Sequence, residues 1–268
     1  MPRIKTNVIR RSLLVLLILC IVFLCHLYFR HDSSPEPGEK SRPDSINVIV
    51  INLDRRPDRL SWMQGQLEAL NWPWMRLSAT DSRDVDLQAT VRRDVITAEA
   101  AREVNMPDAH KTFGITLTSG AVGCALSHLR AWDNAEKSDV PTLVMEDDVE
   151  LRMAQEGVSS IQALLRRLED VPSDWDIVYL GSGQYETETA RTDAERRAET
   201  RGVRVVAHAY CLYGYVIRAS SVKQMRAVLP LRSQIDGQLQ ELGLRKYILE
   251  PNLVVPRRDL ISNIQIVD

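Results

Sequence analysis

Three consecutive acidic residues, Glu146, Asp147 and Asp148, follow the apolar segment PTLVM, which is typical of a buried strand. Ligands of open α/β sheets bind at the carboxyl ends of strands, and carboxylates there suit a hard divalent cation such as Mn²⁺ or Mg²⁺. An acidic triplet after a strand is also common in a solvated turn. The pattern therefore favours a metal site, with Asp148 as a catalytic ligand, beside the simpler alternative of a turn.

A second polar group follows the apolar run INVIVINL at residues 46–53. It contains Asn52, Arg55 and Arg59, next to the start of the next predicted helix. Guanidinium groups and backbone N–H groups at a helix start suit a phosphate or a ribose. We expect these three side chains to contact a nucleotide, although each could also be an ordinary helix-surface residue.

His128 and Asp236 are further candidates whose spacing alone does not decide their role. His128 lies one helical turn after Cys124, beside a predicted buried face, so it is either a core histidine or part of a site. Asp236 precedes a predicted helix and is either an N-cap or a carboxylate carried into a cleft. The glycines of Gly181-Ser182-Gly183 lack the order of a phosphate-binding fingerprint.

Strands and helices alternate along the chain, which predicts an α/β fold with a mostly parallel central sheet flanked by helices. Thr118 or Ser119 can cap the long helix, and the polar residues 184–201 are expected to form a mobile loop beside the site. The predicted strands are 46–53, 74–79, 140–145, 176–180 and two within 204–218, and the predicted helices are 57–70, 120–137, 158–168 and 220–229.

The N-terminal part reads as a membrane anchor. Residues 12–29 form an apolar run of 18, long enough to cross a bilayer, and the basic residues precede it. The prediction is a cytosolic tail (1–11), a transmembrane signal anchor (12–29), a stem (30–45) and one lumenal domain (46–268) in the Golgi or endoplasmic reticulum. A cleaved signal peptide is the alternative, but the following residues HLYFR offer no cleavage site.

Charge and cysteine content limit the partners. The chain has 34 Lys and Arg against 36 Asp and Glu, which argues against nucleic acid as a partner. Cys124 and Cys211 are too few for a disulfide framework, and we expect buried free thiols rather than a pair.

Six segments occur in an order that resembles glycosyltransferase family 25, which includes lipooligosaccharide and collagen hydroxylysine galactosyltransferases. They span roughly residues 47–240. The segments are VIVINLDRRPDRL, LTSGAVGCALSHLRAW, PTLVMEDDVEL, WDIVYLGSG, HAYCLYGYVIRASSV and IDGQL.

The resemblance implies a GT-A-like fold and an inverting transfer of a hexose, usually galactose, from a UDP-sugar to a hydroxyl of a glycan or protein. It implies a metal held by residues 146–148 and a donor pocket shaped by Ser127 and His128, with Asp236 as the candidate base. Two departures are Ala121, where an acid is usual, and the turn ATDSRD, which lacks the customary glycine. They bear on donor and acceptor preference.

Two other functions fit parts of the pattern. A catalytically silent relative could use the fold as a lumenal binding or adhesion module, against which the intact acids at 146–148 count. A metal-dependent phosphotransferase or nucleotidyltransferase could carry the same acidic strand end, and the mass of its product would distinguish it from a sugar transferase.

Overall fold

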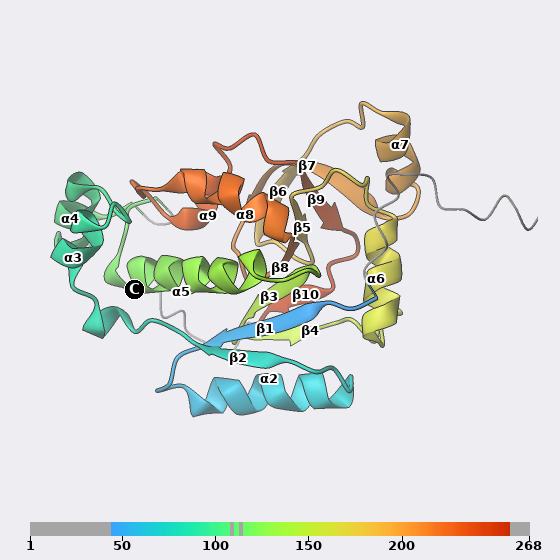
Figure 1. Ribbon diagram of the computed structural model, residues 1–268, viewed down its shortest axis with the longest axis horizontal. Helices are drawn as coiled ribbons and strands as arrows, with labels where there is room; N and C mark the ends of the chain where they lie inside the picture. The colour runs from blue at the N-terminus through green and yellow to red at the C-terminus, as the bar shows by residue number, and fades with distance from the viewer. Residues whose placement is uncertain (1–43, 108–109, 113–114, 258–268) are drawn as a thin grey trace, which may run out of the picture. The chain divides into compact units, whose positions relative to one another are not determined.

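The computed structural model describes residues 44–107, 110–112 and 115–257 (Figure 1). The predicted cytosolic tail and membrane anchor, and the stem up to residue 43, lie outside these residues. Within the described part, no helix combines the length and apolar character needed to cross a bilayer.

Eight strands form one mixed sheet in the order β2-β1-β3-β8-β5-β9-β7-β6. The bounds are β1 Asn47–Asn52, β2 Met75–Ser78, β3 Thr142–Glu146, β5 Ile177–Tyr179, β6 Gln184–Thr187, β7 Val203–Tyr210, β8 Gly214–Ile217 and β9 Lys246–Leu249. β1 pairs in parallel with β2 and β3, and β5 with β9, whereas the other four pairings are antiparallel. The prediction of a mostly parallel sheet is therefore wrong, because an apolar run shows that a strand is buried but not which way it runs.

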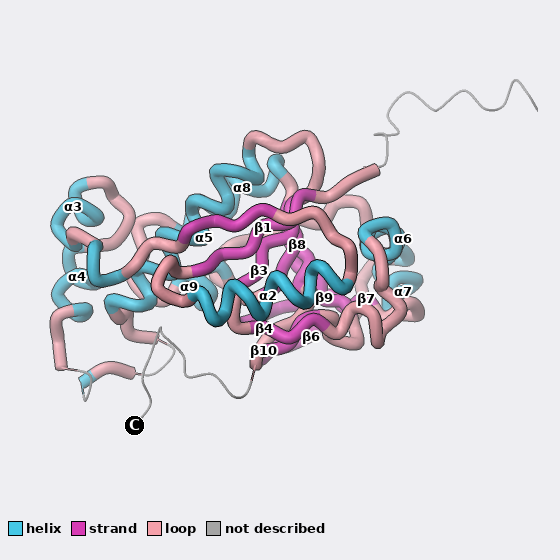
Figure 2. Tube along the Cα trace, turned by 90° about the horizontal axis from the view of Figure 1, so that it is seen from below, coloured by secondary structure: helices cyan, strands magenta, loops and turns pink. Residues whose placement is uncertain are grey.

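Helices cover both faces of the sheet. Figure 1 shows α5 on one side of β1 and β2 and α2 on the other, and Figure 2, seen from below, places α2 in front of the strands. The helix bounds are α2 Pro57–Ala69, α3 Leu87–Arg92, α4 Ala98–Val104, α5 Ser119–Glu136, α6 Ile161–Glu169, α7 Asp193–Glu199, α8 Ala219–Met225 and α9 Ile235–Leu239, with 3-10 turns at Ser82–Asp84 and Arg226–Val228.

Alternate residues of the central strands supply two separate apolar cores. In β1, Ile49 and Ile51 pack in the core beneath α5, whereas Val48 and Val50 pack in the core beneath α2. This is the two-residue period of a strand that is buried on both faces. The buried first strand, the direct passage into a helix that begins at Pro57 and the cap at Thr118 are all confirmed.

A small sheet of β4 (Val149–Leu151) and β10 (Val254–Pro256) follows the acidic triplet and explains one of the glycines. A Cβ built on Gly181 would lie 1.9 Å from the carbonyl oxygen of Val254. Gly181 is therefore required for the close approach of the chain at β10, and this approach accounts for it without a phosphate.

Two predicted segments differ from the structure. Residues 184–201 contain β6 and α7 rather than a mobile loop, because β6 pairs with β7 and a capping box between Thr192 and Glu195 starts α7. The helix predicted at 220–229 is an α-helix only to Met225 and continues as a 3-10 turn to Val228, which ends at Leu229 because Pro230 disfavours helical geometry in the residue before it.

Candidate active site

The acidic triplet lies at the carboxyl end of β3, as expected, next to the start of β8. Glu146 is the last residue of β3, and its N–H donates to the carbonyl of Tyr213 at 3.0 Å. The side chain of Glu146 is 20% exposed, and its Oε1 lies 3.2 Å from Nε2 of His128. Glu146 therefore stands between the interior of the protein and the pocket described below.

Asp147 turns inward and is bonded on both carboxylate oxygens. Its Oδ2 accepts from Asn52 Nδ2 at 2.6 Å, and its Oδ1 accepts from Arg59 Nη1 at 3.1 Å. Burial raises the pKa of Asp147, while the bonds from Asn52 and Arg59 oppose that rise. Asn52 and Arg59, both predicted to contact a nucleotide, are thus buried and directed at this carboxylate.

Asp148 is the most accessible of the three carboxylates, with 27% of its side chain exposed. Its Oδ2 accepts from the same Arg59 nitrogen at 2.9 Å. Burial raises the pKa of Asp148 to about 6, and the charge of Glu146 adds to the rise, whereas Arg59 opposes it. Arg59 therefore holds Asp147 and Asp148 together at the carboxyl end of β3.

A pocket with an empty volume of about 580 Å³ opens beside the triplet. It lies between the end of β1, the segment after β2 and the first turns of α5, and the stated volume includes the solvent at its open side. Asn52 and Asp236, among the described candidates, are outside its lining. The lining residues are Ile51, Leu53, Arg55, Arg59, Ala79, Thr80, Ser82, Gly120, Cys124, Ser127, His128, Glu146, Asp147 and Asp148.

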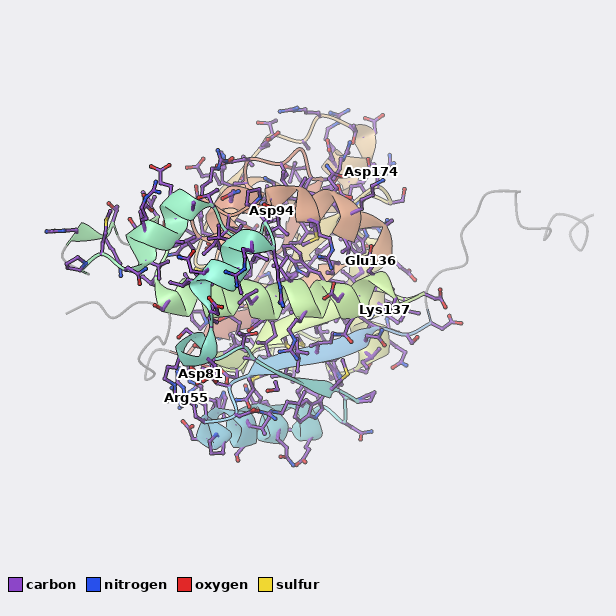
Figure 3. All side chains as sticks on the ribbon, turned by 60° about the vertical axis from the view of Figure 1, so that its left-hand side comes forward. Arg55, Asp81, Asp94, Glu136, Lys137 and Asp174 are labelled. Carbon is purple, nitrogen blue, oxygen red and sulfur yellow. The ribbon has the colours of Figure 1, made fainter. Side chains whose placement is uncertain are left out.

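Arg55 contributes a positive charge on the outer side of the pocket. Its Nε donates to Asp81 Oδ2 at 2.8 Å, and Figure 3 shows the two side chains together below α5. Hydrogen bonds from Arg83 and Arg55 lower the pKa of Asp81. The pair is partly exposed, so the guanidinium of Arg55 can exchange Asp81 for an anionic ligand at small cost.

The first half of α5 is fixed against the segment after β2. A Cβ on Gly123 would lie 2.8 Å from the carbonyl of Thr80, so the helix approaches the segment at a glycine. The hydroxyl of Ser127 accepts from the Thr80 N–H at 2.9 Å and donates to the Gly123 carbonyl at 2.7 Å. Ser127 therefore shapes the pocket wall by joining its two sides.

A family model described as Glycosyltransferase family 25 (LPS biosynthesis protein) matches residues 45–236, the part of the chain that carries β1, α5 and the acidic triplet. The chain belongs to glycosyltransferase family 25. The resemblance seen in the six sequence segments is thereby confirmed.

Curated relatives include family 25 members named as inactive and members named as galactosyltransferases. "Inactive glycosyltransferase 25 family member 3" of Homo sapiens is 30% identical over 207 residues, which cover 72% of this chain and 31% of the relative. "Procollagen galactosyltransferase 1-A" of Xenopus laevis is 28% identical over 194 residues, with coverages of 70% and 30%. "Procollagen galactosyltransferase 1" of Danio rerio is 25% identical over 228 residues, with coverages of 84% and 36%. The chain spans about a third of the length of these relatives.

Asp236, the candidate base of this family 25 chain, lies in the first turn of α9 and faces the turn between β7 and β8. Its Oδ2 accepts from the N–H of Cys211 at 2.8 Å, and its Oδ1 accepts from the N–H of Gly237 at 2.9 Å. The N-cap residue of α9 is Gln234, so Asp236 is not the N-cap. Cys211 lies between the end of β7 and the start of β8, and β8 pairs at Gly214 with Met145 of β3, so Asp236 lies at the same end of the sheet as the acidic triplet.

Cys124 and Cys211 are both free thiols, as expected, but the expectation that both are buried is wrong, because Cys124 is only partly buried and Cys211 is exposed. Cys211 is exposed and has a left-handed backbone with φ of 72°. Burial raises the pKa of Cys124 well above its ordinary value.

Two kinds of site residue escaped prediction. Thr80 and Ser82 line the pocket from an irregular segment that has no periodic pattern. Tyr215 accepts a hydrogen bond from Trp132 and lies 2.9 Å from His128, although its sequence context is only that of a buried strand. His128 and Trp132 are four positions apart and therefore share one face of a helix. This spacing is the signal in the sequence for a polar partner such as the Tyr215 hydroxyl on that face.

Proposed function

We propose that this family 25 protein is a metal-dependent inverting glycosyltransferase that moves a hexose, galactose, from a UDP-sugar to a hydroxyl of a glycan or protein acceptor. The observation that carries the proposal is the lining of the pocket, which joins Arg55 at one side to the carboxylates of Glu146 and Asp148 at the strand end. A nucleotide in it would place its diphosphate toward the acidic strand end and beside Arg55. The galactosyltransferases among the curated relatives support the choice of sugar.

The residues at the strand end fit a divalent metal. Glu146 and Asp148 present carboxylate oxygens to the pocket, which are the ligands that Mn²⁺ and Mg²⁺ prefer. Asp147, the third predicted ligand, has hydrogen bonds on both oxygens and would support the other two from behind. A bound metal would supply charge neutralisation for the departing diphosphate.

The other predicted residues take roles that their positions allow. Arg55 would pair with the diphosphate. Ser127 would hold in place the pocket wall against which the uracil or the ribose of the nucleotide packs. Asp236 would accept the proton of the acceptor hydroxyl as that oxygen attacks the anomeric carbon from the face opposite the leaving UDP. The two backbone N–H groups on Asp236 would fix the direction of its carboxylate.

A catalytically silent binding module is the second candidate. It is favoured by two observations: relatives named as inactive, and the position of Arg59, whose guanidinium already neutralises Asp147 and Asp148. In that case the pocket would bind a nucleotide sugar or glycan without turning it over.

UDP release from a panel of UDP-sugars, with Mn²⁺ and with EDTA, distinguishes the two. We expect metal-dependent release from UDP-galactose, a product heavier than the acceptor by one hexose, and a loss of at least about 100-fold in Asp148→Asn. Asp139→Asn, an exposed acid beyond the other end of β3, is the matched control and should retain full activity. A folded wild type that turns over none of the sugars supports the silent module.

We also propose that residues 12–29 anchor the chain in the Golgi or endoplasmic reticulum with the domain from residue 46 in the lumen. The support is the sequence pattern of that segment alone, an apolar run preceded by basic residues.

A further inference from the structure

Three buried side chains lead from the core to Glu146. His128 and Trp132 lie one turn apart on α5, and both reach the hydroxyl of Tyr215 on β8. Trp132 Nε1 donates to that hydroxyl at 2.9 Å, and His128 Nδ1 lies 2.9 Å from it. The other ring nitrogen, Nε2, lies 3.2 Å from Glu146 Oε1. His128 is 1% exposed and Tyr215 is 0% exposed, so water does not compete for the two bonds at the Tyr215 hydroxyl.

The direction of each hydrogen bond follows from the chemistry of the groups. An indole N–H can only donate, so Tyr215 accepts from Trp132 and has one proton of its own to give. Burial keeps that proton on the hydroxyl, because it raises the pKa of Tyr215 well above its ordinary value. The proton then points at His128 Nδ1, which must accept. A neutral imidazole that accepts at Nδ1 carries its proton on Nε2, and that N–H faces Glu146.

We propose that Trp132, Tyr215 and His128 are positioning residues. Trp132 and Tyr215 fix His128 as the Nε2–H tautomer, and that N–H holds the Glu146 carboxylate at the edge of the pocket. The effect on transfer rests on the proposed function, whereas the tautomer itself does not. His128 thereby acts on Glu146 from the protein side and leaves the outer face of the carboxylate to the pocket.

The same geometry offers an alternative that the hydrogen-bond directions exclude. Cys124 Sγ, His128 Nε2 and a Glu146 oxygen lie within 4.8 Å of one another, a donor set that could hold a metal such as Zn²⁺. Metal on Nε2 would move the ring proton to Nδ1 and make Tyr215 accept twice. Its own proton would then have no acceptor among the described residues, a costly arrangement in a buried position.

The tautomer can be read directly by NMR. Protein labelled with ¹⁵N at histidine gives ring correlations that distinguish Nε2–H from Nδ1–H, and the His128 signals are those that disappear in His128→Gln. We expect Nε2–H in the wild type, a shifted Nδ1 signal in Tyr215→Phe, and no change on adding ZnCl₂. An Nδ1–H wild type, an unshifted Tyr215→Phe or a Zn²⁺-dependent shift overturns the proposal.

A matched control exists on the neighbouring strand. Tyr179 of β5 lies directly across from Tyr215 in the antiparallel pair and is equally buried, so Tyr179→Phe also removes one buried hydroxyl. It should leave the His128 spectrum unchanged. A shift as large as that of Tyr215→Phe would show a general change in packing and would overturn the assignment.

Turnover measurements test whether the hydrogen bonds from Trp132 through Tyr215 and His128 to Glu146 affect the reaction. Tyr215→Phe should lower kcat about threefold to tenfold with KM for the UDP-sugar changed less than twofold, the effect of one hydrogen bond acting on the reacting state. His128→Gln, whose amide can still donate to Glu146, should retain more activity than His128→Ala, and Tyr215→Phe should add no further loss to it. Independent, additive losses would contradict action through His128.

Discussion

Arg59 is the residue on which the arrangement of the acidic triplet depends most. Its guanidinium is 4% exposed and bonds to both Asp147 and Asp148. Arg59→Met would leave the buried Asp147 and the partly exposed Asp148 without this counter-charge, and we expect the free energy of unfolding to fall by about 3 kcal/mol. Urea unfolding at neutral pH measures this.

The control for Arg59 is Arg152→Met, which removes an arginine of an exposed pair with Glu150 and should leave stability nearly unchanged. Adding Asp147→Asn to Arg59→Met should recover part of the loss, because one unpaired charge is removed. Equal stabilities of Arg59→Met and Arg152→Met would show that the ion pairs of Arg59 with Asp147 and Asp148 contribute nothing.

Glu250 gives a prediction for the pH dependence of stability. Burial would raise its pKa, but hydrogen bonds from Arg204 and the Tyr185 hydroxyl outweigh burial and lower it. A carboxylate whose pKa is lower in the folded state than in the unfolded state stabilises the fold at pH values above the unfolded pKa of about 4.3. This stabilisation is lost as the pH falls through the pKa of the folded state. The wild type should therefore exceed Glu250→Gln in stability at pH 7, and the difference should shrink below about pH 4.3. A difference that grows toward low pH would contradict the sign.

At the scale of elements, two glycines differ in the space around them: Gly181 is closely packed and Gly65 is not. Gly181→Ala would push a Cβ into the Val254 carbonyl and should destabilise the protein by about 3 kcal/mol, since backbone cannot move aside cheaply. Gly65→Ala, inside α2 with no atom near the new Cβ, should stabilise by up to about 1 kcal/mol. Thermal unfolding compares them, and a Gly181→Ala protein as stable as the wild type would contradict this account of β10.

The N-cap of α5 tests whether that helix positions the pocket. Thr118→Ala and Thr192→Ala each remove a hydroxyl that accepts from a helix N–H at 3.1 Å, so each should cost about 1 kcal/mol of stability. Only Thr118→Ala should weaken UDP binding, because α5 lines the pocket and α7 does not. Equal UDP affinity in the two variants, measured by calorimetry, would show that the cap is not needed for the site.

Most elements were predictable because their signals are local. The apolar run before Asn52, Pro57 at the first helical position and Thr118 as a cap each determine structure within a few residues. Strand direction was not predictable, because the antiparallel placement of β8 between β3 and β5 depends on contacts far apart in sequence. The partners of the candidate residues, such as Asn52 and Arg59 with Asp147, depend on the same long-range contacts.

At the scale of the whole molecule, the described domain brings Arg55 and several acidic side chains to the same end of a mixed sheet. Arg55 comes from the end of β1, the triplet from β3 and Asp236 from α9. The separate positions of Arg55 and Asp236 at this end fit the proposed two-substrate reaction, with the nucleotide beside Arg55 and the acceptor beside Asp236.

The anchor prediction is also a property of the whole chain. With residues 12–29 in the membrane, alkaline carbonate should leave the full chain in the membrane pellet, because a spanning helix resists extraction. A variant lacking residues 1–29 should be released. Full-length protein in the carbonate supernatant would contradict the anchor.

The most direct test of the central claim is a crystal structure of the protein with UDP and Mn²⁺, with the metal located by its anomalous signal. We predict the nucleotide between the end of β1, Thr80 and the start of α5, and the metal on oxygens of Glu146 or Asp148 at about 2.2 Å. A nucleotide bound elsewhere, or a metal held by Cys124 and His128 instead, would contradict the account.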